Sequence, residues 1–243
     1  MKCRPRTLPY ACLLAAMLLF PSLPNRAAED TFTAVNPATG QTEAVWIGTP
    51  AGTSLREVYW SVLQDEGWAP AVRVTTDAAD DHRPTLAFSP AGARHLVFWK
   101  SQTIDTVYYT TSPATGGAWT TPVAISDPAE TSRDPRVVVH GGTVSAAWST
   151  CPTTGSPKIV VGKGDSADPW ARTTIAILNP GASPAVQIAS AAGHLWVDWI
   201  DSASSLGYSE SLSGTWGAVN NEPYLGVADI DAGRLRIKGR VVN

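Results

Sequence analysis

Residues 108–125 read YYTTSPATGGAWTTPVAI, and this stretch decides the fold class. Its first residues are aromatic and β-branched, which predicts a β-strand. The Pro, Gly and Thr residues that follow are typical of a turn, and Trp119 stands at the end of that turn. The last four residues, PVAI, predict a second short strand. The stretch is therefore two strands joined by a turn that carries a tryptophan.

Tryptophan recurs along the rest of the chain in two series. One series ends an apolar strand, with intervals of 53, 49 and 51 residues between Trp46, Trp99, Trp148 and Trp199. The other follows the turn, with intervals of 51, 51 and 46 residues between Trp68, Trp119, Trp170 and Trp216. Eight of the ten tryptophans belong to these series, so the chain is an internal repeat. The indoles are expected to be apolar wedges between neighbouring units.

Each repeat predicts four short strands. The first is apolar and begins at Pro84, Pro135 or Pro184, and residues 31–35 take this place in the first repeat. One four-stranded sheet cannot bury both of its faces, whereas such sheets arrayed around an axis bury a continuous core. The sequence thus predicts an all-β propeller of four-stranded antiparallel blades. Its repeats are residues 31–83, 84–134, 135–183 and 184–233, with a partial fifth at 234–243.

Composition and charge limit the function. The chain has 243 residues, of which 44% are hydrophobic and 16% charged, so it can form a packed core and is not a disordered chain. The formal net charge is −3, which argues against nucleic-acid binding. The four histidines lack the spacing of metal ligands, and no phosphate-binding glycine loop occurs. We therefore expect neither a metal nor a cofactor.

The N-terminus predicts a secretory signal peptide over residues 1–28, ahead of one domain over residues 29–243. Basic residues precede an apolar run at 11–20, which ends at Pro21 and leads to the small pair Ala27-Ala28. The run is too short to span a bilayer, so we expect a secreted or periplasmic protein without a membrane span. Cleavage would leave Cys151 as the only cysteine. Its thiol would then be buried, reactive or paired between chains.

The repeat resembles that of the sialidase-like, or neuraminidase, β-propeller superfamily, and the resemblance covers residues 31–220. Residues 108–125 and the sequence YSESLSGTW at 208–216 carry it best. The family's Asp-box, Ser/Thr-x-Asp-x-Gly-x-x-Trp, is intact in no repeat, and its Arg-Ile-Pro motif is absent. The nearest matches to the arginine of that motif are Arg83 and Arg136. The resemblance is therefore specific for the architecture and weak for the activity.

The number of blades is an open question at this stage. A sialidase propeller has six blades, whereas four repeats are complete here. The strand expected at 235–237 could pair with the first blade and close a small ring, or subunits could complete a larger ring as a homo-oligomer. Alternatively, the chain is a shortened member of a longer family. A ring left open exposes strand edges, and we expect a partly open or small propeller.

The candidate ligand site lies in the loops that lead into the first strands, because these loops converge on the axis of a propeller. Two of them are charged, at residues 77–83 and 130–134. Their guanidinium groups could hold a carboxylate by two parallel hydrogen bonds. In addition, the acid Asp198 stands beside the indole of Trp199, and the two could help to bind a sugar. The predicted ligand-binding residues are His82, Arg83, Arg133, Asp134, Arg136, Asp198 and Trp199.

Two functions stay open. The favoured one is an exported, non-catalytic propeller that binds a glycan or an extracellular protein through its axial loops, because the catalytic markers of the family are missing. The alternative is a sialidase-like glycoside hydrolase with diverged motifs. A hydrolase would need a carboxylic acid and a tyrosine nucleophile activated by a carboxylate. The candidates are Asp81 and Tyr108, with Tyr59 or Tyr208 in place of Tyr108.

Overall fold

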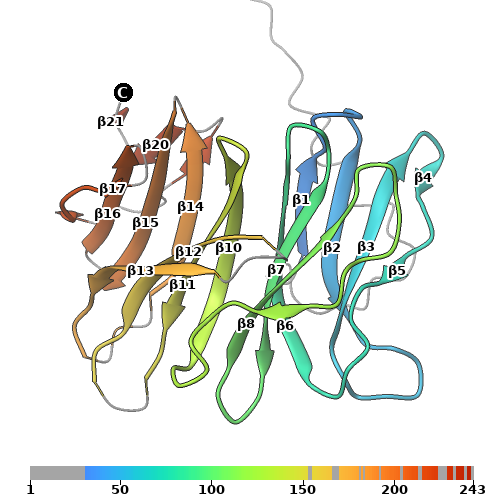
Figure 1. The fold of residues 1–243 in the computed structure, drawn as a ribbon, viewed down its shortest axis with the longest axis horizontal. Coiled ribbons are helices and arrows are strands. Elements are labelled where there is room, and N and C mark those ends of the chain that lie inside the picture. Colours follow the sequence, from blue (N-terminus) through green and yellow to red (C-terminus); the bar gives the residue numbers. More distant parts are fainter. Residues whose placement is uncertain are drawn as a thin grey trace, which may run out of the picture.

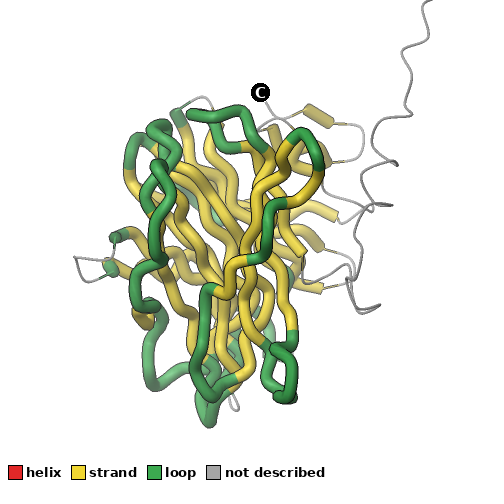
Figure 2. The backbone as a smooth tube through the Cα atoms, turned by 90° about the vertical axis from the view of Figure 1, so that its right-hand side faces the viewer, coloured by secondary structure: helices red, strands yellow, loops and turns green. Residues whose placement is uncertain are grey.

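The structure is a computed structural model, and the residues it describes are 31–152, 155–165, 170–180, 182, 184–191, 193–202, 205–212, 215–223, 229–231, 234–237 and 240–241. The predicted signal peptide lies outside these residues. The described part consists of strands and loops without a helix, which confirms the prediction of an all-β protein (Figure 2). None of it forms an apolar helix long enough to cross a membrane.

Four antiparallel sheets follow one another along the chain, and we call them blades 1 to 4 (Figure 1). Blade 1 contains β1 (Thr31–Val35), β2 (Thr42–Gly48), β3 (Glu57–Gln64), β4 (Gly67–Trp68) and β5 (Val72–Arg73). Blade 2 contains β6 (Asp80–Phe88), β7 (Arg94–Ser101), β8 (Thr106–Ser112) and β9 (Val123–Ala124). In both blades the strands pair in chain order, and β5 adds to β3.

The second half of the chain repeats this plan. Blade 3 contains β10 (Ser132–His140), β11 (Thr143–Thr150), β12 (Lys158–Lys163) and β13 (Ala171–Ile177). Blade 4 contains β14 (Val186–Ala191), β15 (His194–Ser202), β16 (Ser205–Leu212), β17 (Thr215–Trp216) and β18 (Asn220–Pro223), which pairs with β16. A further sheet of three short strands contains β19 (Asp229–Asp231), β20 (Arg234–Ile237) and β21 (Arg240–Val241).

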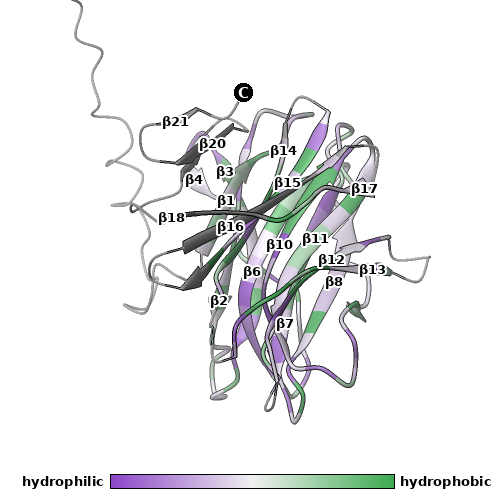
Figure 3. Cartoon of the chain, turned by 90° about the vertical axis from the view of Figure 1, so that its left-hand side faces the viewer, coloured by the Kyte–Doolittle hydropathy of each residue, from purple (hydrophilic) through white to green (hydrophobic). Residues whose placement is uncertain are grey.

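The first strands of the blades form the inner layer. β1 contacts β6, β6 contacts β10, and β10 contacts β14, while the later strands of each blade lie farther out. Figure 3 shows β6 and β10 side by side, with hydrophobic and hydrophilic residues along both strands. This radial order of antiparallel sheets is that of a β-propeller, as predicted.

Buried apolar side chains fill the interface between each blade and the next. Between blades 1 and 2 they are Val45, Val58, Leu86, Leu96 and Phe98. Between blades 2 and 3 they include Val97, Val107, Tyr109, Val137, Val144 and Trp148. Between blades 3 and 4 they include Ala147, Ile159, Val161, Val186, Leu195 and Trp199. Most of these side chains are aliphatic, and each cluster also contains a buried aromatic, which is Trp148 or Trp199 in two of the three.

Trp148 and Trp199 are wedges of the predicted kind. Each is 1% exposed and packs from the second strand of its blade against the preceding blade. The packing around Trp148 is tight, because a β-carbon on Gly162 would lie 2.8 Å from its ring and 2.9 Å from that of Trp170. Glycine is therefore the residue that fits between these two indoles.

Trp99 departs from this pattern. Its neighbour Phe98 packs against blade 1, whereas Trp99 packs at the interface with blade 3. Successive residues of a strand point to opposite faces of the sheet, so a shift of one residue reverses the direction of a side chain. Phe98 therefore holds the place that Trp148 holds in blade 3. The uneven intervals of 53 and 49 residues on either side of Trp99 are the trace of this shift in the sequence.

The inner strands begin earlier than expected. Pro84 and Pro135 were expected to open their strands, with charged loops ahead of them. Instead β6 begins at Asp80 and β10 at Ser132, so both prolines and the charged residues just before them lie within strands. Each proline stands where the ladder is interrupted by a register shift. A proline can be accommodated in a strand at such a bulge because it has no N–H to donate to the ladder.

Candidate functional site

Two β-bulges mark one end of the inner layer. The register shifts between His82 and Thr85 on β6, and between Arg133 and Arg136 on β10. Within these bulges Arg83 has a φ of 46° and Asp134 a φ of 55°. Residues other than glycine rarely adopt this left-handed backbone, and such strain is often kept at functional sites. Arg83 and Asp134 are 51 residues apart, so the same strained position occurs in two consecutive repeats.

The side chains at and beside these bulges, together with Gln187 of the next inner strand, form a polar group that we call the axial cluster: Arg83, Asp134, Arg136 and Gln187. Arg83 Nε lies 3.1 Å from Asp134 Oδ1, across the interface between blades 2 and 3. Arg136 donates from Nε to Gln187 Oε1 at 3.3 Å on β14, and from Nη1 to the carbonyl of Pro135 at 3.1 Å. The cluster thus links three consecutive inner strands.

The charged groups of the axial cluster act on one another. Burial lowers the pKa of Arg136, and the positive charge of Arg83 lowers it further, while the Asp134 carboxylate acts in the opposite direction. The carboxylate of Asp134 thus pairs with Arg83 and acts electrostatically on Arg136. The axial cluster favours an additional anion, which would relieve the repulsion between the two cations.

Next to this cluster is an aromatic stack. The rings of His82 and Trp99 lie 4.0 Å apart at an interplanar angle of 12°. Arg133 Cζ lies 5.2 Å from the centroid of the Trp99 ring, and Arg133 donates from Nε to Asp105 Oδ2 at 2.5 Å. The displaced Trp99 thus contacts two of the predicted ligand-binding residues. Because its ring is already engaged by His82 and Arg133, we assign it a supporting role beneath the cluster.

Asp81 and Tyr108, the predicted catalytic pair, lie at the interface between blades 1 and 2. Asp81 is 0% exposed. Thr75 donates its hydroxyl to Asp81 Oδ2, and Lys100 Nζ lies 3.8 Å from Oδ1. The same ammonium group lies 4.8 Å from the centroid of the Tyr108 ring. Both predicted residues therefore lie near Lys100, on the blade 1 side of β6. Asp134, the partner of Arg83, lies on the opposite side, in blade 3.

The environment of Asp81 raises its pKa to about 7, chiefly through burial, with a smaller contribution from the charge of Glu57. Glu57 is also 0% exposed and accepts a hydrogen bond from Arg73 Nη2 at 2.6 Å. Burial lowers the pKa of Lys100, against the influence of Glu57. Burial is the main cause of both pKa shifts, because Asp81 and Lys100 lie in the interior between blades 1 and 2.

The repeat explains how Asp81 comes to be there. The N–H of Asp81 donates to the carbonyl of Arg56 at 2.9 Å, and the N–H of Ser132 donates to that of Asp105 at 2.7 Å. Two hydroxyl groups 51 residues apart in sequence repeat a second contact. Thr75 accepts a hydrogen bond from the N–H of Val58 on β3 at 2.9 Å, and Ser126 accepts one from the N–H of Val107 on β8 at 3.0 Å. Asp81 thus occupies a structural position that the next repeat fills with serine.

Asp198 and Trp199 lie within blade 4. Asp198 is 4% exposed and Trp199 1% exposed, and Trp199 belongs to the apolar cluster between blades 3 and 4. Burial raises the pKa of Asp198 to about 6. Asp198 pairs in register with Gln187 of the axial cluster, so it lies beside the cluster on the sheet. The buried indole of Trp199 leaves no face for a sugar in this structure. The side chain of Tyr208 lies outside the described residues.

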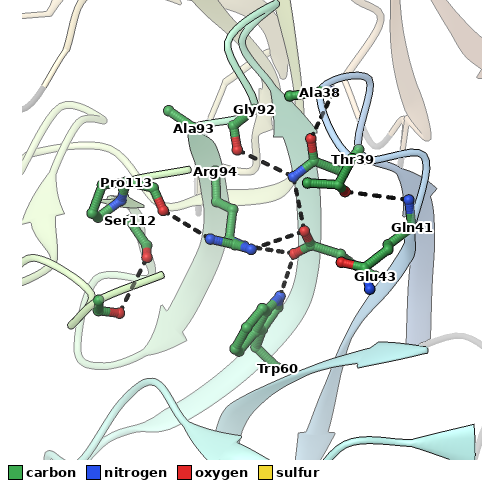
Figure 4. Close-up of polar contacts among 12 residues, drawn as sticks. Ala38, Thr39, Gln41, Glu43, Trp60, Gly92, Ala93, Arg94, Ser112 and Pro113 are labelled. Atoms are coloured by element: carbon green, nitrogen blue, oxygen red, sulfur yellow. Dashed lines mark hydrogen bonds and ion pairs between the residues drawn. The ribbon is translucent and has the colours of Figure 1, made fainter. Parts of the chain in front are cut away.

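A second polar group, at the opposite end of the blades, was missed by the sequence reasoning. Glu43 is 0% exposed and accepts hydrogen bonds from Arg94 Nε at 2.6 Å and Nη2 at 3.0 Å (Figure 4). Trp60 Nε1 donates to the same carboxylate at 2.6 Å, and Asn36 Nδ2 at 2.9 Å. The sequence could have indicated that Glu43 is buried, because it alternates with Val45 and Ile47 on the face of β2 that packs against blade 2.

Among the described residues, no three His, Cys, Asp or Glu side chains converge in a way that could hold a metal ion. Cys151 is half-buried and unpaired in this chain, and burial raises the pKa of its thiol. A raised pKa disfavours the thiolate, which is the reactive form of cysteine.

Known structures share this arrangement of blades. No protein-family model and no curated protein matches the chain. Among solved structures, the Trypanosoma rangeli sialidase in complex with the inhibitor DANA matches with a TM-score of 0.57 and 14% identity, over 79% of this chain and 38% of that one. The leech intramolecular trans-sialidase with 2,7-anhydro-Neu5Ac gives a TM-score of 0.63 at 10% identity, over 82% of this chain and 51% of that one.

A third neighbour is the intramolecular trans-sialidase from Ruminococcus gnavus in complex with oseltamivir carboxylate, with a TM-score of 0.62 and 10% identity, over 82% of this chain and 71% of that one. The chain has a sialidase-like β-propeller fold, as its repeats predicted. It spans 38% and 51% of the length of the first two neighbours. At this level of identity the likeness defines the fold alone.

Proposed function

We propose that this protein is a sialidase-like propeller that binds a carboxylate-bearing sugar of the sialic acid class at the axial cluster, without cleaving it. One observation carries the proposal: Arg83 pairs with Asp134 at strained bulge positions of adjacent inner strands, and Arg136 lies within electrostatic reach of both. Guanidinium groups bind carboxylates in a planar, two-point geometry. The amide of Gln187 offers a further polar group for sugar hydroxyls.

The sugar class is supported by the neighbours. The leech and Ruminococcus enzymes are described as trans-sialidases, and the Trypanosoma enzyme as a sialidase with the inhibitor DANA. These structures hold DANA, 2,7-anhydro-Neu5Ac and oseltamivir carboxylate, and a carboxylate is the group that the axial cluster favours. An extracellular protein with an exposed acidic side chain would meet the same guanidinium groups and is the competing ligand for this site.

Binding without hydrolysis is supported by the position of the predicted catalytic residues. A glycosidase acid must reach the oxygen of the glycosidic bond. Asp81 is 0% exposed and turned toward Thr75 and Lys100, and Tyr108 contacts the same lysine. One observation favours the hydrolase as second candidate: a pKa of about 7 would keep Asp81 protonated near neutral pH, as a general acid requires.

Titration calorimetry with 3′-sialyllactose and lactose tests the binding proposal. We expect the sialylated sugar to bind and lactose to give no heat, because only the first carries a carboxylate. Arg83→Gln and Arg136→Gln should each weaken binding at least about tenfold, through loss of a charged hydrogen bond. Arg172→Gln is the matched control, because this arginine lies on the outer strand β13 and pairs there with the side chain of Asp127, which precedes β10. Equal binding of both sugars would contradict the proposal.

Release of a fluorogenic aryl sialoside distinguishes the binder from the hydrolase. We expect no turnover from the purified protein. Turnover that disappears in Asp81→Asn, with 3′-sialyllactose binding retained, would establish the second candidate instead. A glycan array, with acidic peptides as competitors, separates a sugar ligand from a protein ligand.

Export is part of the same proposal and rests on residues 1–28. The expected outcome is a mature protein in the periplasm or medium whose first residue follows Ala27 or Ala28. N-terminal sequencing of the secreted protein checks this, and a cytoplasmic protein that retains Met1 would contradict it.

A further inference from the structure

We infer that Asp134 is a built-in competitor of the ligand: its carboxylate occupies, on Arg83, the place that the carboxylate of a bound sugar takes. The inference rests on the proposed function and deepens it, because it names the residue that limits affinity and selects among acidic sugars.

The repeat supplies the first step. Arg83 and Asp134 occupy the same bulge position of consecutive inner strands, both with left-handed backbone. At this position blade 2 presents a cation and blade 3 an anion, and the two side chains meet at 3.1 Å. The fold therefore places the carboxylate of Asp134 against the guanidinium of Arg83, where the carboxylate of a ligand would bind.

Exposure supplies the second step. The side chains of Arg83 and Asp134 are 37% and 26% exposed, so solvent reaches the pair and a ligand can displace it. Exposed ion pairs contribute little to stability, and their exchange is correspondingly easy. The Glu43–Arg94 pair is the contrast within the same chain, with exposed fractions of 0% and 7% and further hydrogen bonds to the carboxylate. That pair is structural, whereas the Arg83–Asp134 pair is exchangeable.

Charge supplies the third step. Arg136 experiences both the carboxylate of Asp134 and the cation of Arg83. An incoming carboxylate gains from both arginines and is repelled by Asp134, which must turn away. A simple monocarboxylate therefore gains little by replacing Asp134. A sugar that adds hydroxyl contacts, for example to Gln187, overcomes this competition, and Asp134 thereby favours such sugars over small acids.

The test is Asp134→Asn, measured by titration calorimetry with 3′-sialyllactose, acetate and lactose. Asparagine keeps the size of the side chain and tolerates left-handed backbone, so the bulge is retained. Removing the ion pair and the repulsion should tighten 3′-sialyllactose binding about five- to tenfold. Acetate should gain at least as much, and lactose should stay without heat. Asp127→Asn removes the same charge from an exposed pair with Arg172 and serves as the control.

The outcomes separate the two levels of the proposal. Tighter binding in Asp134→Asn, abolished again in the double variant Arg83→Gln/Asp134→Asn, supports the inference. Unchanged or weaker binding of 3′-sialyllactose by Asp134→Asn overturns it and leaves the proposed function in place. Absence of 3′-sialyllactose binding in the wild type and in every variant overturns both. A gain of the same size in Asp127→Asn shows a general charge effect and also overturns the inference.

Discussion

Asp81 and Ser132 hold equivalent places in consecutive repeats, yet only Asp81 can ionise. Both are 0% exposed, and each donates its N–H to the preceding blade. Because serine satisfies this joint between blades 2 and 3, the carboxylate of Asp81 is not needed to hold the backbone together. Asp81 is instead a buried acid, and its Oδ1 atom has no hydrogen-bond partner among the described residues. Because burial raises the pKa of Asp81, we expect the joint between blades 1 and 2 to be sensitive to pH.

We predict that Asp81→Ser removes part of the pH dependence of stability. The pKa of Asp81 is raised in the folded protein to about 7, above its value of about 3.9 in an unfolded chain. The folded state therefore binds this proton more tightly, and its free energy of unfolding falls as the pH rises from about 4 to 7. The loss is at most about 4 kcal/mol for this group. Urea unfolding at pH 5 and pH 8 should show a smaller difference for the variant than for the wild type.

The comparison isolates Asp81 because Asp198, whose pKa is raised to about 6 by burial, titrates in both proteins. Asp127→Ser, an exposed acid, is the control and should behave as the wild type. An Asp81→Ser variant with the full pH dependence of the wild type would show that Lys100 keeps Asp81 ionised in the folded state.

At the same scale, the sequence located the charged residues of the axial cluster but not their partners. Arg83, Asp134 and Arg136 could be singled out because charges next to the prolines of a repeat are conspicuous. That Arg83 would meet Asp134 depends on two bulges, and bulges leave no clear trace in composition. Asp81 was grouped with them because it is two residues from Arg83. The bulge at Arg83 interrupts the alternation of side chains along β6, so Asp81 lies in the joint with blade 1 whereas Arg83 meets Asp134 of blade 3.

Strand pairs across the interfaces form the next scale, and the Glu43–Arg94 pair joins β2 to β7. Its carboxylate has three partner side chains, and Arg94 Cζ lies 4.6 Å from the centroid of the Trp60 ring. Arg94 also donates from Nη1 to the carbonyl of Pro113 at 2.8 Å. A buried charge pair of this kind fixes one alignment of the two sheets, because any slip would leave a charge unpaired.

We predict that Glu43→Ala destabilises the protein by about 3–5 kcal/mol, since it leaves Arg94 buried without its counter-charge. The double variant Glu43→Leu/Arg94→Met should lose less, because it leaves no buried charge. Glu130→Ala is the matched control: its pair with Lys158 is about one-third exposed on both sides, and we expect a loss under about 1 kcal/mol. Urea unfolding measures all three, and a loss in Glu43→Ala no larger than in the control would contradict the prediction.

The order of strands was predictable because each strand has its own signature within the repeat. The positions of the strand ends were not, since Asp80–Arg83 and Ser132–Asp134 are polar and look like loops. They extend the inner strands because their backbone groups pair with β7 and β11, and pairing partners are a tertiary property. The displacement of Trp99 has the same origin: the interval between tryptophans was visible, but the face that each indole takes depends on the local register.

The whole molecule behaves as a series of sheets that contact their neighbours. Within the described residues, apolar clusters join blade 1 to blade 2, blade 2 to blade 3, and blade 3 to blade 4. In such a series stability is the sum of the blades and the interfaces between them. Blades 2 and 3 are then held by two of these clusters, and blades 1 and 4 by one.

Hydrogen exchange should therefore differ between the blades. We predict that the amides of β7 and β11, the second strands of blades 2 and 3, exchange more slowly than those of β2 and β15 in blades 1 and 4. Local opening of a blade costs the interfaces that it breaks, and the inner blades break two. Mass spectrometry of peptides after deuterium labelling measures this order. Equal protection of all four strands would indicate that blades 1 and 4 each have a second partner, either within one closed ring or between subunits, and native mass measurement would then distinguish a closed monomer from an assembly.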